Sequence, residues 1–218
     1  MIAFIFLTAF LAAAQPPAPH WGSLPADTAA GLKTEGIHEE KYERLAGGDV
    51  LTERRPVPAG KTGVHMAALG IVRSPVDKLW KAIEDCGETP AFLPHLESCA
   101  LVKPDYPLAP NQRWEELEMN FRILFFNKSA RLVNEDTMEA PNYLRWNQVR
   151  GDAKVNEGYY RIITIVPDTQ LVVYDALVDP GVSVPDFVKT WIIRKSLPGV
   201  ITALRDRLES SPRSRYAF

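Results

Sequence analysis

The residue types that most often carry out chemistry in proteins are few and scattered in this sequence. The four histidines, His20, His38, His65 and His95, are too far apart along the chain to form a local metal-binding motif. There is no G-x-S-x-G, G-x-G-x-x-G or P-loop sequence, so the common hydrolase and nucleotide-binding signatures are excluded. We therefore predict no catalytic residue, no metal site and no cofactor.

The two cysteines, Cys86 and Cys99, flank a segment in which Thr89 and Pro90 open a very short predicted helix. Two cysteines are too few for a disulfide-dense scaffold or a four-cysteine zinc site. In an exported protein such a pair favours a disulfide, which would close a short loop. The alternative is two free thiols buried in the core.

The first 14 residues resemble an export signal. Met1 to Ala14 is apolar, carries no charged side chain and ends in three alanines, which fits an A-x-A cleavage site. The run is shorter than the roughly 20 apolar residues that span a membrane. We predict a signal peptide at 1–14 and a periplasmic or secreted protein, with an uncleaved anchor or a lipid-facing helix as alternatives.

Composition and charge bound the class of protein. The chain has 218 residues, of which 46% are hydrophobic, so it is not disordered. Its 25 basic and 27 acidic residues nearly balance, which argues against a dedicated nucleic-acid binder, because phosphate contacts need a basic surface. The length suits one domain with a small extension.

The remaining chain divides into three parts. Residues 15–60 are expected to form an N-terminal linker with a short helix at 38–46 and an extended segment at 49–57 that Pro56 confines to an edge or a loop. Residues 61–209 form the main domain, and 210–218 a flexible tail. A strand at 64–72 is followed by a helix with a predicted Ser74–Asp77 capping box. Further strands are expected at 98–103, 112–121, 123–134, 143–150, 157–166 and 170–179, with a turn at 134–136.

The domain closes with a long amphipathic helix from Ser183 to about Leu208. The order of elements predicts an α+β fold in which a curved antiparallel sheet has its apolar face covered by this helix. If the sheet wraps the helix loosely, an elongated apolar cavity lies between them.

Several stretches in this order resemble the START-like superfamily, also called the polyketide cyclase/dehydrase-like or helix-grip proteins. They are Ser74-Pro75-Val76, Thr89 to His95, Asn156 to Tyr160, Val178 to Gly181 and Lys195 to Val200. The chain is most similar to exported bacterial members and to the coenzyme Q-binding START-domain group. The resemblance covers about residues 45–209. It implies a helix-grip fold and a pocket for a hydrophobic ligand between sheet and C-terminal helix, with the loop between the cysteines at the pocket entrance.

Strand alternation supplies the side chains that would line this pocket. Leu117, Met119 and Phe121 share one face of their strand, and Tyr174 lies on the face opposite Asp175. For 157–166 alternation alone is ambiguous, and the resemblance favours Tyr160 inward. The predicted ligand-binding set is Leu117, Met119, Phe121, Trp146, Tyr160, Tyr174, Phe187 and Trp191. The alternative is that all of these residues are ordinary core.

Three functions fit these features. The preferred one is non-catalytic binding or transport of a lipid, quinone or sterol-like molecule, with transient membrane contact left open. The second is a polyketide aromatase/cyclase-type enzyme, which needs an internal acid or base; the tyrosines are the clear inward candidates, whereas Glu116 and Glu118 are assigned to a solvated face. The third is a protein-interaction module with a collapsed cavity, which would use a convex apolar patch of Tyr159, Ile163, Val173 and Leu177 unless residues 20–60 cover it.

Overall fold

The computed structural model describes residues 16–123, 126–181 and 186–209; within these ranges the side chains of 121–123, 126–128, 186–193 and 195 are not described. The predicted signal peptide at 1–14, the predicted start of the long helix at Ser183 and the tail at 210–218 therefore lie outside the described residues. None of the helices in the described part of the chain is long and apolar enough to cross a membrane.

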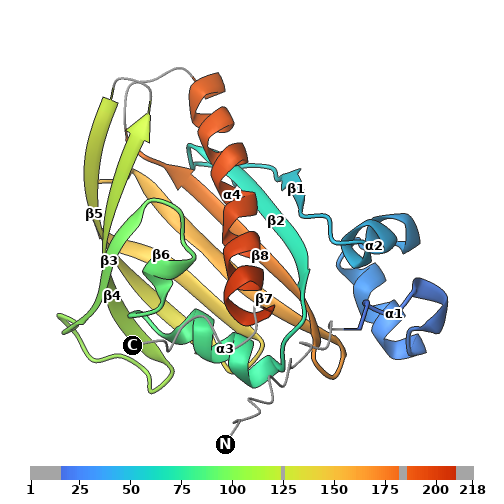
Figure 1. The fold of residues 1–218 in the computed structure, drawn as a ribbon. Coiled ribbons are helices and arrows are strands. Elements are labelled where there is room, and N and C mark those ends of the chain that lie inside the picture. Colours follow the sequence, from blue (N-terminus) through green and yellow to red (C-terminus); the bar gives the residue numbers. More distant parts are fainter. Residues whose placement is uncertain (1–15, 124–125, 182–185, 210–218) are drawn as a thin grey trace, which may run out of the picture.

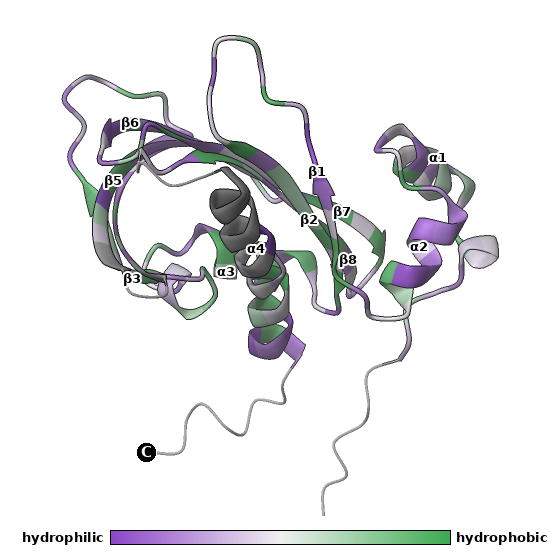
Figure 2. Ribbon diagram, turned by 90° about the horizontal axis from the view of Figure 1, so that it is seen from above, coloured by the Kyte–Doolittle hydropathy of each residue, from purple (hydrophilic) through white to green (hydrophobic). Residues whose placement is uncertain are grey.

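One antiparallel sheet of eight strands dominates the structure (Figure 1), in the order β1-β2-β8-β7-β6-β5-β4-β3. The strands are β1 (Leu51–Arg54), β2 (Val64–Val72), β3 (Leu96–Val102), β4 (Gln112–Ile123), β5 (Phe126–Glu139), β6 (Tyr143–Gly151), β7 (Val155–Val166) and β8 (Thr169–Asp179). The helices are α1 (Ala26–Thr34), α2 (Glu39–Ala46), α3 (Val76–Glu84) and α4 (Asp186–Glu209), with 3-10 turns η1 (Trp21–Ser23) and η2 (Thr89–Ala91). The sheet curves around α4 (Figure 2), so the predicted helix-grip fold is confirmed.

Each face of the sheet has its own core. On the concave face, α3 and α4 pack against a cluster that includes Trp80, Trp146, Tyr160 and Ile201. On the convex face, α1 and α2 bury a second cluster, in which Leu32, Tyr42 and Leu45 are fully buried. This cluster contains Val173, with Tyr159 and Ile163 packed against it. Residues 20–60 thus cover much of the convex patch on which an interaction module would depend.

Two local predictions were wrong. Asn134 to Asp136, expected as a turn, lie inside β5, where Asn134 pairs with Glu115 of β4 and with Gln148 of β6. The ladder on both sides overrides the turn preference of these short polar residues, and the chain turns at 140–142 instead. The Ser74 capping box does not form: α3 begins at Val76, and the Ser74 hydroxyl contacts the Pro75 carbonyl.

The helix α4 lies close against β2. At Gly70 an added Cβ would stand 2.5 Å from the Ile201 side chain, so only glycine allows this approach. The Arg205 guanidinium then bonds three carbonyl oxygens, those of Ile71 at 2.7 Å, Gly48 at 2.7 Å and Asp49 at 3.2 Å. These contacts fix α4 to both β2 and the chain that follows α2.

Replacing Arg205 by Met should lower the free energy of unfolding by about 1–3 kcal/mol, chiefly because the part-buried Ile71 carbonyl loses a charged donor. Urea denaturation of Arg205→Met beside Arg194→Met, an exposed position on the same helix, measures this difference. Equal midpoints for the two variants would show that the Arg205 contacts do not hold α4.

Candidate functional site

The ladder registers show which side chains share the concave face. Leu117 pairs with Leu132, Trp146 with Gly158, and Tyr160 with Tyr174, so alternate residues from β4 to β8 point to one side. Leu117, Met119, Trp146, Tyr160 and Tyr174 are therefore brought to one face. The side chains of Phe121, Phe187 and Trp191 lie outside the described residues. Whether this set binds a ligand stays a prediction.

Three aromatic residues form the centre of the concave face. The ring centroids of Trp146 and Tyr174 are 5.4 Å apart, those of Trp146 and Tyr160 5.7 Å, and those of the two tyrosines 4.7 Å. Gly158 makes room for the indole, since a Cβ there would stand 2.4 Å from Trp146 Cζ2. The cluster is therefore built on a glycine that the strand pattern alone does not explain.

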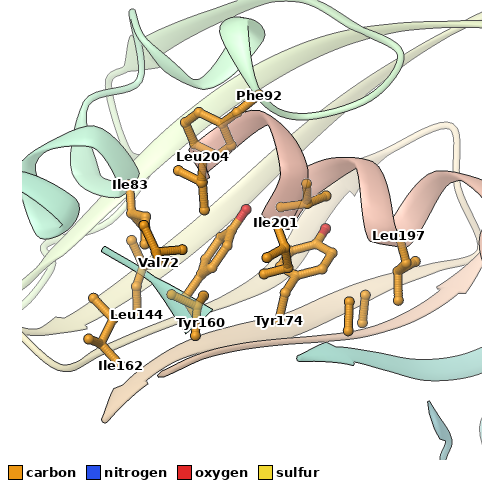
Figure 3. Close-up of a cluster of buried hydrophobic side chains, with 14 of the residues drawn as sticks. Val72, Ile83, Phe92, Leu144, Tyr160, Ile162, Tyr174, Leu197, Ile201 and Leu204 are labelled. Atoms are coloured by element: carbon orange, nitrogen blue, oxygen red, sulfur yellow. The ribbon is translucent and has the colours of Figure 1, made fainter. Parts of the chain in front are cut away.

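The two tyrosine hydroxyls point from the sheet towards α4 (Figure 3). The Tyr160 side chain is buried, and its hydroxyl has no hydrogen-bond partner among the described residues. Burial, followed by the charges of Tyr174, Glu115 and Asp136, raises the pKa of Tyr160 well above its usual value. Tyr160 thus offers a neutral hydroxyl inside the protein.

A buried acidic pair lies on the same face. Glu115 of β4 and Asp136 of β5 are 7% and 3% exposed. Arg113 Nη2 lies 2.5 Å from Glu115 Oε1, and Arg113 Nε lies 3.7 Å from Asp136 Oδ2. Burial raises the pKa of Glu115 and, with the charge of Glu115, raises that of Asp136 strongly. The two carboxyl groups therefore bind a proton more readily than exposed ones do.

Sequence reasoning missed this pair, although a signal was present. Glu115 stands two and four residues before Leu117 and Met119, so the alternation that places those two on the concave face also places Glu115 there. Asp136 was hidden by the wrong turn assignment at 134–136. Gln148 and Asn156 extend the polar part of this face, and Asn156 Nδ2 donates to Asn134 Oδ1 at 3.0 Å.

The concave face is unevenly covered. Under α4, the side chains of Ala68, Val172 and Ile201 are fully buried. Further along the sheet, Met119 and Met138 are only half-buried, as is Gln148. The part formed by β4 to β6 therefore retains accessible surface beside the acidic pair.

The predicted disulfide between Cys86 and Cys99 is present, with an S–S distance of 1.98 Å. It joins the chain after α3 to β3 and lies beside Glu115, whose Oε2 is 3.7 Å from Cys99 Sγ. A surface depression of about 390 Å³ adjoins it, lined by Lys81, Glu84, Asp85, Cys86, Gly87, Cys99, Ala100, Leu101 and Arg113. Arg113 thus belongs both to this depression and to the buried acidic pair.

A model of the family described as polyketide cyclase / dehydrase and lipid transport matches residues 72–205. The chain belongs to this family. The match spans α3, strands β3 to β8 and most of α4, which together with β2 build the concave face. A search of curated proteins returned no match.

Solved structures of low sequence identity share the fold. A STAR-related lipid transfer protein from Xanthomonas axonopodis is 16% identical with a TM-score of 0.57, covering 75% of this chain and 99% of its own. Human StAR-related lipid transfer protein 5 is 12% identical with a TM-score of 0.59, covering 84% and 96%. The Zhui aromatase/cyclase from Streptomyces sp. R1128 is 12% identical with a TM-score of 0.53, covering 66% and 93%.

Reducing the disulfide should lower the free energy of unfolding by about 3 kcal/mol, because the reduced chain regains loop entropy in the unfolded state. Urea denaturation with and without a phosphine reductant measures the change. The double variant Cys86→Ala/Cys99→Ala, which should be insensitive to the reductant, is the control. Two thiols alkylated without reductant would show that the bond is absent in solution.

The acidic pair should make stability depend on pH. Folding raises the pKa of both carboxyl groups above their ordinary values, 4.5 for Glu115 and 3.8 for Asp136. The stability that the protonated pair contributes is therefore fully present below these ordinary values, and it is lost as pH rises through the folded-state pKa values. Asp136→Asn should therefore gain stability relative to the parent as pH rises from 4 to 9. Urea denaturation across this range, with the exposed Asp105→Asn as control, measures the gain; parallel profiles for parent and Asp136→Asn would contradict it.

Proposed function

We propose that this protein binds or carries a hydrophobic small molecule, such as a lipid, quinone or sterol-like compound, between the concave face of the sheet and α4. The observation that carries the proposal is the buried Tyr160 hydroxyl within the aromatic cluster, which has no hydrogen-bond partner in the described part of the chain. A buried hydroxyl without a partner costs about 1–3 kcal/mol. That cost is offset if the hydroxyl bonds a ligand atom.

The surroundings of Tyr160 suit a mainly apolar ligand. Trp146 and Tyr174 offer flat ring surfaces on one side, and the aliphatic residues of α4 face them on the other. Binding sites of this kind are apolar with a few polar groups that orient the ligand. The half-buried residues Met119 and Met138 supply surface that a ligand would cover.

Two of the structural relatives are lipid transfer proteins by name, which supports a carrier. The disulfide is compatible with an exported carrier, which would meet its ligand in the periplasm or outside the cell. Transient membrane contact would then allow the ligand to be loaded. We propose no nucleic-acid partner.

A cyclase-type activity is the second candidate, and the buried acidic pair favours it. A carboxylic acid with a raised pKa on the same face as an internal tyrosine is the kind of acid/base group that such chemistry needs. Turnover of a polyketide-like substrate that Asp136→Asn abolishes, with ligand binding retained, would support the enzyme. Binding without turnover supports the carrier.

Filling the concave face should block binding. Met119→Trp adds a bulky ring beside the predicted ligand path and should weaken uptake of a fluorescent lipid analogue at least 10-fold, on the general ground that bound ligands need matching space. Glu118→Trp, one residue away on the exposed face of β4, is the matched control and should bind like the parent.

Uptake is measured by fluorescence titration, and native mass spectrometry of the protein from its host gives the stoichiometry. A parent protein that carries no apolar ligand and takes up none of the analogues would contradict the proposal. Equal weakening by Met119→Trp and Glu118→Trp would place binding elsewhere.

A further inference from the structure

The polar groups on the concave face limit which head group a bound ligand can have. From the arrangement of Arg113, Glu115, Asp136 and the Tyr160 hydroxyl we infer that the bound molecule has a neutral polar end, a hydroxyl or carbonyl group, and that carboxylate and phosphate head groups are excluded. This inference rests on the proposed function, because it names the class of ligand for the same site.

The first step is the balance of charge. The polar cluster, which consists of Arg113, Glu115 and Asp136, contains one guanidinium and two buried carboxyl groups. Glu115 already contacts the guanidinium, which also donates to the Glu84 carbonyl oxygen at 2.5 Å. Asp136 also lies near the guanidinium, so the two carboxyl groups balance or exceed its single positive charge whether or not Asp136 is protonated. The cluster therefore has no uncompensated positive charge for an anion.

The second step is the charge that surrounds the cluster. Asp85, just after α3, adds negative potential at Glu115. Asn134, Gln148 and Asn156 on the neighbouring strands are neutral. A buried anion would meet carboxyl groups rather than a free cation, and an unpaired buried charge is strongly unfavourable.

The third step is the hydrogen bonding that remains. The Tyr160 hydroxyl and the Gln148 Oε1 atom have no partner among the described residues. The Tyr160 hydroxyl can both donate and accept, so it can bond an alcohol by itself. A ketone or quinone oxygen would accept from Tyr160. Asp136 pairs with Trp146 across β5 and β6, and the Trp146 ring centroid lies 5.7 Å from that of Tyr160, so the acidic pair and this tyrosine belong to one interior region.

The test compares ligands with the same alkyl chain. 1-Dodecanol and dodecanoate at pH 8 are titrated against a protein loaded with a neutral fluorescent alkyl probe. We expect dodecanol to displace the probe at a concentration at least 10-fold lower than dodecanoate. The variant Glu115→Gln/Asp136→Asn keeps the side-chain shapes and leaves the positive charge of Arg113 without a compensating carboxylate. In this variant dodecanoate should displace the probe at a concentration at least 10-fold lower than in the parent.

Glu116→Gln/Glu118→Gln, which removes two charges from the other face of β4, is the matched control and should keep the parent preference. Tyr160→Phe is the second variant, which keeps the test valid if the double variant unfolds. It should weaken the binding of dodecanol at least 5-fold and leave the binding of dodecanoate unchanged. Dodecanoate binding as tightly as dodecanol to the parent would overturn the inference and leave the proposed function standing. Failure of the probe and both competitors to bind would overturn the proposed function itself.

Discussion

The close approach of α4 to β2 determines what the rest of the concave face can do. Gly70 allows Ile201 to sit directly on the strand, and the three carbonyl bonds of Arg205 hold the helix at that edge. Because α4 lies over β1, β2 and β8, the far strands β4 to β6 are less completely covered. A helix centred on the sheet would bury both halves equally and leave a solid core.

This placement gives the concave face two halves of different character. The half under α4 is apolar and closely packed, as Ala68 and Val172 illustrate. The other half combines Met119 and Met138 with the acidic pair, and the aromatic cluster stands between them. An amphiphilic ligand with a long apolar part and a small neutral polar end would match both halves.

Much of the fold followed from the sequence because its signals were local and repeated. The strand at 64–72 has the predicted bounds, and alternation placed Leu117 and Met119 on one face and Tyr174 opposite Asp175. The disulfide followed from two cysteines around a short loop. The prediction failed where long-range pairing decides the outcome, as at Asn134 to Asp136, whose local preference is a turn. Alternation also places Glu115 on the face of Leu117 and Met119, but charged residues are seldom buried, and its partner Asp136 comes from the strand that was assigned to a turn.

Methyl NMR of protein labelled at its methionines tests the central claim most directly. Met119 and Met138 lie on the less covered half of the concave face, whereas Met66 is buried in the core cluster with the residues of α4. With a long-chain alcohol bound, the account predicts intermolecular NOEs from the ligand chain to the Met119 and Met138 methyl groups. A bound ligand that leaves both of these methyl resonances unchanged would contradict it.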